Sequence, residues 1–251
     1  MKRRFDWRPR FDKRSKKYPV RELLWANPRR VDRVWEIGPI LDQGREGACV
    51  GFGWTAQTLA SPFSTDPNIL NPREPNQFAL HVYKSAQKID EWPGENYDGT
   101  SVLAGAKTMK RLNLIGSYGW AFSVDEVIDA IIARGPVVLG IPWYDSMYSA
   151  PHGVVKVSGS QVGGHCILAI GFRAASPNFD GRPSVLLQNS WGPSWGINGV
   201  AEIEVEELAK LLKTHAEACL PLDGPYKRRI NISVLLQNFK TKAKNLLMTS
   251  R

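Results

Sequence analysis

The spacing of apolar residues changes part-way along the chain, and this change limits the fold more than any other feature of the sequence. In the first half, apolar side chains recur about every three to four positions, as in helices that pack one face against a core. Segment 123–135 adds a predicted helix start, because Ser123 is a good N-cap and Glu126 follows it by three residues. The sequence therefore predicts a mainly helical lobe over about 43–134.

After this helical part, apolar residues form short continuous runs that are bounded by glycine, proline and asparagine. The runs are "PVVLGIPW" (136–143), "GGHCILAIGF" (163–172), "SVLLQNSW" (184–191) and "GVAEIEV" (199–205). Runs of this length and composition are typical of strands. We therefore expect a mainly β lobe over about 135–224, and an α+β fold overall.

The composition is that of a globular chain in a reducing compartment. With 43% hydrophobic and 23% charged residues among 251, the chain can bury a full core. No apolar stretch is long enough for a membrane span, and no apolar stretch follows the basic start as it would in a secretory signal. The three cysteines, Cys49, Cys166 and Cys219, lack the spacing of a disulfide framework. We expect a cytoplasmic protein that is not secreted by a signal peptide.

Both ends of the chain are strongly basic. Residues 1–36 hold 13 Lys and Arg against 5 Asp and Glu, and residues 224–251 hold 7 against none. These two excesses are larger than the net charge of +9, so the stretch between them is acidic. We divide the chain into a basic N-terminal arm (1–36), a central domain (37–224) and a basic C-terminal tail (225–251). The ends either bind an anionic partner, such as nucleic acid or an acidic protein assembly, or are solvated tails.

The stretch "LDQGREGACVGFGW" (41–54) places a cysteine at the start of a predicted helix. A lone cysteine on an apolar helix is most often a packing residue. Gly44 and Gly47, however, permit a tight turn before the helix, so that Cys49 lies in its first turn. Unpaired backbone N–H groups and the helix dipole at this position favour a thiolate. We therefore interpret Cys49 as a nucleophile, with Gln43 beside it.

A nucleophilic thiol needs a base, and the sequence offers His165 for this role. His165 lies at the start of a predicted strand, after two glycines that leave room beside the imidazole. Asn189 lies at the end of the next predicted strand, where its side-chain amide can accept the N–H of the imidazole and hold the ring in one orientation. Cys49, His165 and Asn189 therefore form a candidate catalytic set.

Three segments resemble the signature blocks of the papain family of cysteine peptidases. The segment "QGREGAC" (43–49) matches the nucleophile block, "GGH" (163–165) the histidine block, and "NSWGPSWGING" (189–199) the asparagine and tryptophan block. The three blocks occur in the order of the family, and the resemblance covers about residues 36–205. It implies a papain-like fold, in which a helical N-terminal lobe packs on an antiparallel β lobe and the active site lies in the cleft between them.

The resemblance also implies a role for each residue of the candidate set. Cys49 attacks a peptide carbonyl as a thiolate paired with His165, which then protonates the leaving amine, while Asn189 orients His165. The side chain of Gln43 and the backbone N–H of Cys49 form the oxyanion hole. Trp191 covers the Asn–His hydrogen bond, or is simply a large core aromatic. The implied activity is that of a thiol-dependent endopeptidase with an acyl-enzyme intermediate, no cofactor and no metal.

The resemblance further implies a set of substrate-binding residues. The family binds the substrate backbone with a pair of glycines, of which only Gly99 is retained here, in "YDGTS". By their order along the matched segments, Thr100, Gly140, Gly164 and Cys166 line the pocket for the residue that precedes the scissile residue. Their small side chains imply a roomy pocket for a bulky apolar group. Cys166 also fits the interpretation of a core thiol on an apolar strand.

The chain departs from the family pattern in two respects. Glu46 stands where the family often has a cysteine, so the usual disulfide of the helical lobe is absent. Few residues precede Gln43, which leaves no room for a long inhibitory prosegment, so the enzyme is either made active or restrained by its basic N-terminal arm. A member without prosegment and disulfide suits a bacterial or bacteriophage protein, either cytoplasmic or associated with a virion.

Two other function classes stay open. One is a papain-fold structural or binding protein with little catalysis, against which the intact Gln43, Cys49, His165 and Asn189 argue. The other is a peptidoglycan amidopeptidase or an acyl-transfer enzyme, a class that generally lacks the "NSWG" block found here. Labelling of Cys49 by a thiol alkylator would separate an enzyme from a scaffold.

Overall fold

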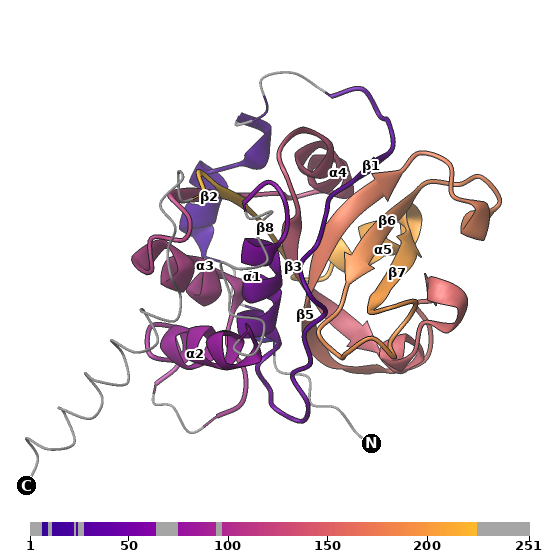
Figure 1. Ribbon diagram of the computed structural model, residues 1–251. Helices are drawn as coiled ribbons and strands as arrows, with labels where there is room; N and C mark the ends of the chain where they lie inside the picture. The colour runs from indigo at the N-terminus through magenta and orange to yellow at the C-terminus, as the bar shows by residue number, and fades with distance from the viewer. Residues whose placement is uncertain are drawn as a thin grey trace, which may run out of the picture.

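The computed structural model describes residues 7–9, 12–22, 24, 28–63, 75–93 and 97–224, and Figure 1 shows how they are arranged. The basic C-terminal tail lies outside the described residues. Its predicted binding to an anionic partner therefore stays a prediction. No helix in the described part is long and apolar enough to cross a membrane.

Three of the five described α-helices come one after another before most of the strands. The α-helices are α1 (Cys49–Leu59), α2 (Pro75–Gln87), α3 (Val102–Arg111), α4 (Val124–Ala133) and α5 (Val205–Leu212). Short 3-10 helices are η1 (Lys13–Lys17), η2 (Val20–Glu22), η3 (Asp145–Tyr148), η4 (Pro151–Gly153) and η5 (Pro177–Phe179). The strands are β1 (Arg33–Val34), β2 (Ser117–Trp120), β3 (Val137–Tyr144), β4 (Val154–Val155), β5 (Gln161–Arg173), β6 (Ser184–Gln188), β7 (Val200–Glu204) and β8 (Glu217–Leu222).

The strands form one sheet, and its central strands contribute side chains to two hydrophobic cores. Their order is β2-β8-β3-β5-β6-β7-β4, with β1 paired to β5, and neighbours run antiparallel except for β4 and β7. On β3, Val138 enters the first core, whereas Val137 and Leu139 enter the second on the opposite face. Side chains of β5 and β8 are divided in the same alternating way. Strands buried on both faces have continuous apolar sequences, which explains the runs found in the second half of the chain.

The first core is the helical lobe, and α1 lies at its centre. All 11 residues of α1 are buried, because α2 and α3 cover it on one side and β5 on the other. Two glycines allow this close packing. A Cβ on Gly51 would lie 2.2 Å from Ala79 O of α2, and a Cβ on Gly53 would lie 2.7 Å from Cys166 Sγ of β5.

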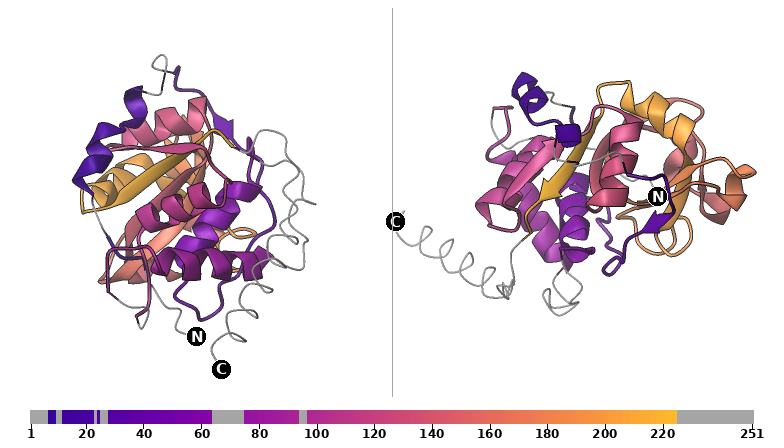
Figure 2. Two further views of the ribbon diagram at one scale, coloured as in Figure 1. Left: turned by 90° about the vertical axis from the view of Figure 1, so that its left-hand side faces the viewer. Right: turned by 90° about the horizontal axis from the view of Figure 1, so that it is seen from above.

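The second core lies on the other face of the sheet, on the side where Figure 2 shows α4 and α5. The apolar face of α4, with Ile128 and Ile131, packs there together with Leu139 and Ile167 of the sheet. The sequence-based range of the helical lobe, 43–134, therefore includes a helix that packs with the β lobe. The apolar period identifies the buried face of a helix but not the surface that it covers.

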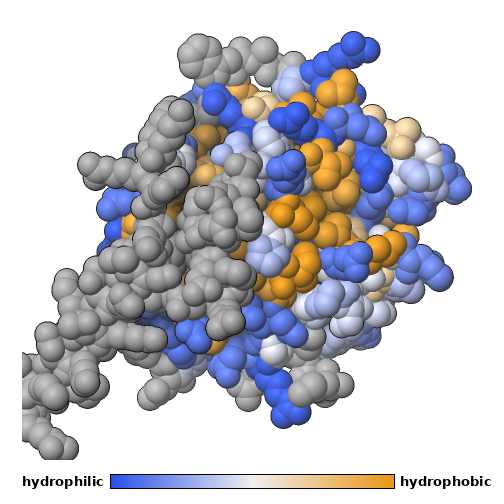
Figure 3. Space-filling view, in the orientation of Figure 1, coloured by the Kyte–Doolittle hydropathy of each residue, from blue (hydrophilic) through white to orange (hydrophobic). Residues whose placement is uncertain are grey.

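Over its described residues the basic N-terminal arm packs against the body of the protein. Val20 is fully buried in the second core, and Tyr18 O accepts the backbone N–H of Trp120. Further along, β1 pairs with β5, and Trp35 Nε1 donates to Ile131 O at 2.7 Å. Apolar residues gather near the middle of the face in Figure 3, over the stretch that carries β1. This stretch then enters the turn that leads to α1.

Replacing Gly51 with alanine should destabilise the fold, although alanine is the better helix former. The added Cβ would meet two backbone atoms of α2, Ala79 O at 2.2 Å and Tyr83 N at 2.7 Å, and backbone atoms cannot turn away as the end of a side chain can. We expect the free energy of unfolding in urea to fall by about 1–3 kcal/mol. Lys110→Ala, an exposed change on α3, should alter it by less than about 0.5 kcal/mol. Equal values for the two variants would contradict the close α1–α2 contact.

Candidate active site

Cys49 is the first residue of α1, and a tight turn leads into it. In this turn Glu46 N donates to Gln43 O at 3.1 Å, and Gly44 has a φ of +60, a left-handed conformation that glycine adopts without strain. The cap position is Ala48, which offers no side-chain acceptor to the first N–H groups of the helix. Because these N–H groups and the helix dipole act at the first turn, an anionic sulfur is favoured there.

A buried hydrogen bond joins His165 of β5 to Asn189, which directly follows β6. His165 Nε2 lies 2.8 Å from Asn189 Oδ1. The register that pairs Leu168 with Gln188 brings the two residues together. Asn189 Oδ1 also accepts Ser190 N at 2.8 Å, which fixes the amide with its oxygen toward the ring. Since a carbonyl oxygen only accepts, Nε2 of His165 carries the proton and Nδ1 is the basic nitrogen.

Two buried tryptophans enclose the His165 ring. The ring centroids of Trp143 and Trp191 lie 4.6 and 4.8 Å from that of the imidazole. The sequence analysis expects Trp191 to cover the Asn–His hydrogen bond, and in the structure Trp191 lies beside the imidazole. Trp143 was missed, because it comes beside the ring only through the register of β3 and β5, which pairs Ile141 with His165. The two indoles shield the His–Asn hydrogen bond from water, which strengthens it.

Gln43 is held by hydrogen bonds to the residue that follows Asn189. Its Oε1 accepts Ser190 Oγ–H at 2.8 Å, and its backbone N donates to Ser190 O at 2.9 Å. Its Nε2 donates to Glu46 O at 2.9 Å, which leaves the second amide hydrogen for another acceptor. Ser190 thus fixes Gln43 relative to Asn189. Ser190 was missed in the sequence analysis, because its role depends on a contact between distant segments.

Helix α1, which begins with Cys49, packs against strand β5, which carries His165. Gly53, one turn after Cys49, abuts Cys166, the neighbour of His165 on β5. Cys49 and Cys166 belong to the same core. The fold therefore brings the cysteine, histidine, asparagine and glutamine of the set to one junction between the lobes.

The other two cysteines have surroundings that keep them neutral. Cys166 and Cys219 lie inside β5 and β8 and are buried. Burial, the largest cause, raises the pKa of each thiol well above its ordinary value, so neither forms a thiolate readily near neutral pH. This environment fits the interpretation of Cys166 as a core thiol. Among the described residues, no cluster of His, Cys, Asp and Glu could hold a metal ion.

Three of the residues predicted to line a substrate pocket contact Trp7 or Arg8 of the N-terminal arm. Trp7 N donates to Gly164 O, and Arg8 N donates to Thr100 O, both at 3.0 Å. A Cβ on Gly140 would lie 2.2 Å from the Trp7 ring, and a Cβ on Gly164 would lie 2.4 Å from it. Gly140 and Gly164 thus leave room that the chain's own Trp7 fills.

The floor of this pocket is a buried carboxyl group that the sequence-based prediction missed. Glu217 Oε2 accepts Trp7 Nε1 at 2.8 Å and Val102 N, at the start of α3, at 3.0 Å. Gly140 pairs with Glu217 on one side and with Cys166 on the other, so the three form one row across β8, β3 and β5. Glu217 thus gives the surroundings of the Trp7 indole one polar end. An acidic residue at the start of the apolar strand β8 was the available signal.

Gly99, predicted to contact the substrate backbone, lies in a turn that is bonded to the helical lobe. It has a φ of +94, and its N–H donates to Tyr83 Oη at 2.9 Å inside the helical lobe. The next residue, Thr100, supplies the carbonyl that bonds to the arm. Gly99 therefore shapes the turn that precedes α3, and its predicted substrate contact stays a prediction.

Comparison with known proteins places this site in a family. Residues 78–219, more than half of the chain, match the papain family of cysteine proteases. The chain belongs to the papain family. The matched residues include His165 and Asn189, whereas Cys49 and Gln43 precede them.

Individual papain-family relatives match different shares of the chain. An uncharacterised peptidase C1-like protein of Acanthamoeba polyphaga mimivirus is 23% identical over 70% of this chain and 71% of that protein. A gut-specific cysteine proteinase of Caenorhabditis elegans is 39% identical over 36% of this chain and 26% of that protein. This second match thus spans about a quarter of the relative's length.

Solved structures of the papain family share the fold. Xylellain, a cysteine protease from Xylella fastidiosa, has a TM-score of 0.61 at 17% identity, over 89% of this chain and 98% of that chain. Digestive procathepsin L2 of Tenebrio molitor has a TM-score of 0.60 at 18% identity, over 86% of this chain and 77% of that chain. These likenesses confirm the predicted papain-like α+β fold.

Glu217→Gln should change how stability depends on pH. Burial, the largest cause, raises the pKa of Glu217 from 4.5 to about 7, against the opposing effect of its hydrogen bonds from Trp7 and Val102. A raised pKa means that the folded state favours the protonated carboxyl. The carboxyl therefore adds no cost below about pH 4.5, and it destabilises the fold as the pH rises toward 7. Between these values the wild type should lose about 3 kcal/mol of unfolding free energy through this group.

The measurement is urea denaturation of the wild type and the variant at about pH 5 and about pH 8. The quantity compared is the difference between the two proteins, because other titrating groups contribute equally to both. The variant should gain relative stability at the higher pH. A difference of the same size at both pH values would contradict the ionisation of a buried Glu217.

Proposed function

We propose that the chain is a thiol-dependent endopeptidase in which Cys49, His165, Asn189 and Gln43 carry out the reaction. The proposal rests mainly on the 2.8 Å hydrogen bond between His165 Nε2 and Asn189 Oδ1. This bond fixes the tautomer of the ring, so that Nδ1 can take up and return a proton. A histidine that served only packing would need no fixed tautomer at the junction with α1.

The first half of the reaction transfers the acyl group to the enzyme. The Cys49 thiolate attacks the carbonyl carbon of a peptide bond and forms a C–S bond, while His165 holds the proton that the thiol has lost. The electron pair of the carbonyl moves onto its oxygen. When it returns, the C–N bond breaks, and His165 gives its proton to the leaving amine. The products are a thioester on Cys49 and a free amine.

The second half releases the acyl group to water. His165, now neutral, takes a proton from a water molecule as the water oxygen attacks the thioester carbonyl. The C–S bond then breaks and leaves a carboxylic acid and the Cys49 thiolate, which again faces protonated His165. Asn189 keeps the ring in place through both halves.

We assign the side chain of Gln43 and the backbone N–H of Cys49 as donors to the oxyanion. In support, Ser190 and Glu46 hold the Gln43 amide from two sides, and one N–H hydrogen of Nε2 is left for a substrate oxygen. Donors that are already oriented need no reorganisation when negative charge develops on the oxygen. Removal of one such donor typically lowers kcat by about 10²–10³-fold.

Alkylation of the thiols over a range of pH tests the role of Cys49. A free cysteine thiol ionises at about pH 8.5, whereas Cys49, at a helix N-terminus and paired with His165, should already react rapidly with iodoacetamide near neutral pH. Peptide mapping should find the label on Cys49, while Cys166 and Cys219 stay unlabelled. Cys49→Ala should abolish hydrolysis of casein with little change in melting temperature.

Other outcomes of this experiment would favour the alternative functions. A labelling rate that rises only above about pH 8 would contradict the thiolate–imidazolium pair. A large loss of stability in Cys49→Ala would favour a packing role in a papain-fold scaffold. Cleavage of peptidoglycan stem peptides without cleavage of casein would favour an amidopeptidase.

Asn189→Ala should slow the enzyme, whereas His165→Ala should inactivate it. The first change leaves the proton carrier in place but less well oriented, and the second removes it. Initial rates on a fluorogenic peptide should show a smaller loss of kcat for Asn189→Ala than the roughly 10²–10⁴-fold that general acid–base catalysis contributes. Equal losses for the two variants would mean that Asn189 does more than orient the ring.

A further inference from the structure

A fully buried indole that has no part in the proposed reaction lies against the imidazole of His165. The ring centroid of Trp143 lies 4.6 Å from that of His165, and the two ring planes meet at 68°. Aromatic rings at such an angle place the edge of one ring, which is positive, at the negative face of the other. The contact therefore has an electrostatic part as well as an apolar one.

The pairing of β3 with β5 makes room for this contact. Trp143 stands opposite Gly163, and His165 stands opposite Ile141. Trp143 and His165 are thus diagonal neighbours on one face of the sheet, a separation that large rings can bridge. Because Gly163 has no side chain, the indole can lean across β5 toward the imidazole.

Other aromatic rings hold the Trp143 indole in this position. Its ring centroid lies 5.3 Å from that of Trp191 and 6.4 Å from that of Trp195. Trp195 is itself fixed by a hydrogen bond from its Nε1 to Met147 O at 3.2 Å. All four side chains belong to the second core. The indole therefore cannot turn away from His165 without disturbing this cluster.

The short distance between the rings indicates that the imidazole directs its edge at the face of the Trp143 indole. Imidazole is the smaller ring, so its centroid can approach a ring face more closely than the centroid of an edge-on indole can. Its edge carries N–H and C–H groups, which become more positive when the ring takes up a second proton. The contact is then a cation–π interaction, which is strongest with tryptophan and gains strength where water is excluded.

We infer that Trp143 is a positioning residue of the proposed reaction, whose indole stabilises the protonated form of His165. The inference rests on the proposed function, in which His165 carries a second proton while the Cys49 thiolate attacks. Asn189 fixes the site of the first proton, because its Oδ1 accepts the N–H of Nε2. Trp143 favours the state that carries the second proton. The two residues therefore control different properties of the same imidazole.

The ionisable groups around His165 and its two tryptophans come from three segments. Cys49 begins α1, Asp42 lies in the turn before it and pairs through its backbone with Trp191, and Tyr148 of η3 stacks on Trp191. Burial raises the pKa of Tyr148 above its ordinary value, so this tyrosine stays neutral. The three groups are the same within each comparison below. A difference between variants therefore reports on the indole.

The first experiment follows the histidine signals by NMR as the pH is changed, in the full-length protein with Cys49→Ala. Without the thiolate, the titration of His165 does not depend on catalysis, and its signal is assigned by its loss in His165→Gln. When Trp143→Leu is added, the midpoint of this titration should move to lower pH by roughly one pH unit, because leucine has no aromatic face. A midpoint that stays in place or moves to higher pH would overturn the inference.

Trp143→Phe keeps the experiment decisive if the leucine variant does not fold. Phenylalanine presents a smaller aromatic face than tryptophan, so the midpoint of His165 should move in the same direction by a smaller amount. If only the phenylalanine variant folds and its midpoint equals that of the protein with Trp143, the inference is wrong.

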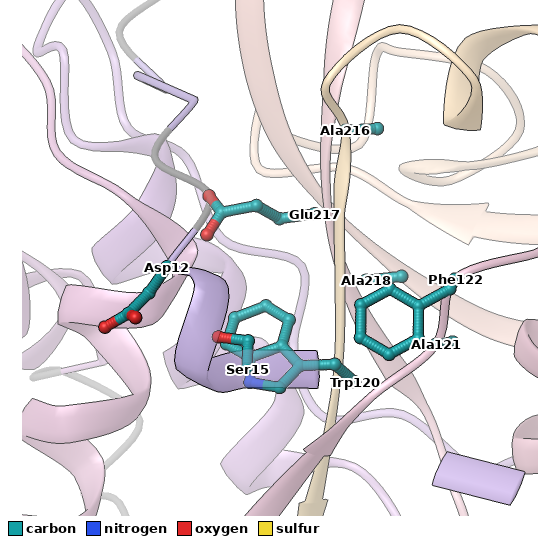
Figure 4. Close-up of a pocket in the computed structure, with 8 residues that line it drawn as sticks. All are labelled: Asp12, Ser15, Trp120, Ala121, Phe122, Ala216, Glu217 and Ala218. Carbon is teal, nitrogen blue, oxygen red and sulfur yellow. The ribbon is translucent and has the colours of Figure 1, made fainter. Parts of the chain in front are cut away.

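A matched control separates the effect of the indole from a general loss of packing. Trp120→Leu removes a buried tryptophan of β2, a strand that β8 and β3 separate from β5. Figure 4 shows Trp120 at a hollow that Ser15 and Glu217 also line. This change should destabilise the protein but leave the midpoint of His165 unchanged. A shift equal to that of Trp143→Leu would contradict a specific role of Trp143.

The second experiment measures kcat/KM against pH on a fluorogenic peptide, with Cys49 intact. Activity falls at high pH when the imidazolium loses its proton, so this limb of the profile should move to lower pH in Trp143→Leu. A lower rate at every pH with an unmoved limb would mean that Trp143 serves packing alone, which would overturn the inference. If the NMR midpoint moves as expected but the protein with intact Cys49 and Trp143 hydrolyses nothing, the proposed function fails and the effect of Trp143 on the imidazole stands.

Discussion

The burial of helix α1 is the constraint on which the candidate site depends. A helix that is covered on all sides can only fit where glycines remove the side chains at its closest contacts, and Gly51 and Gly53 do so toward α2 and β5. This packing holds α1, whose first residue is Cys49, against β5, where Gly53 meets Cys166. Glycine in the interior, which destabilises most helices, here allows the close contact that positions the helix.

Several buried polar groups at the site have their partners in another segment of the chain. His165 is bonded to Asn189, Gln43 to Ser190, and Glu217 to Val102 and Trp7. Each of these bonds joins parts of the chain that are distant in sequence. Because a buried polar group without a partner costs free energy, the fold and the site stabilise each other. Stability lost at one of these bonds would also displace a candidate catalytic group.

Local patterns in the sequence were enough to predict the secondary-structure elements and the motifs. Ser123 accepts Glu126 N at 3.1 Å, as expected from the capping signal, and the apolar runs are strands. Features that depend on contacts between distant segments could not be predicted from such patterns. The arm has no apolar period, so nothing marked Trp7 and Val20 as buried. Trp143 came beside the imidazole only through strand register, and the partner of α4 depended on the face of the sheet that it covers.

The continuity of the sheet has a mechanical consequence for the cleft. Strands β3, β5 and β8 supply side chains to both cores, and their ladder of hydrogen bonds runs without interruption from β2 to β4. Two lobes that share their strands have no hinge between them, since any rotation of one against the other would shear that ladder and both cores together. The two cores should therefore move together as one body, because the strands between them belong to both.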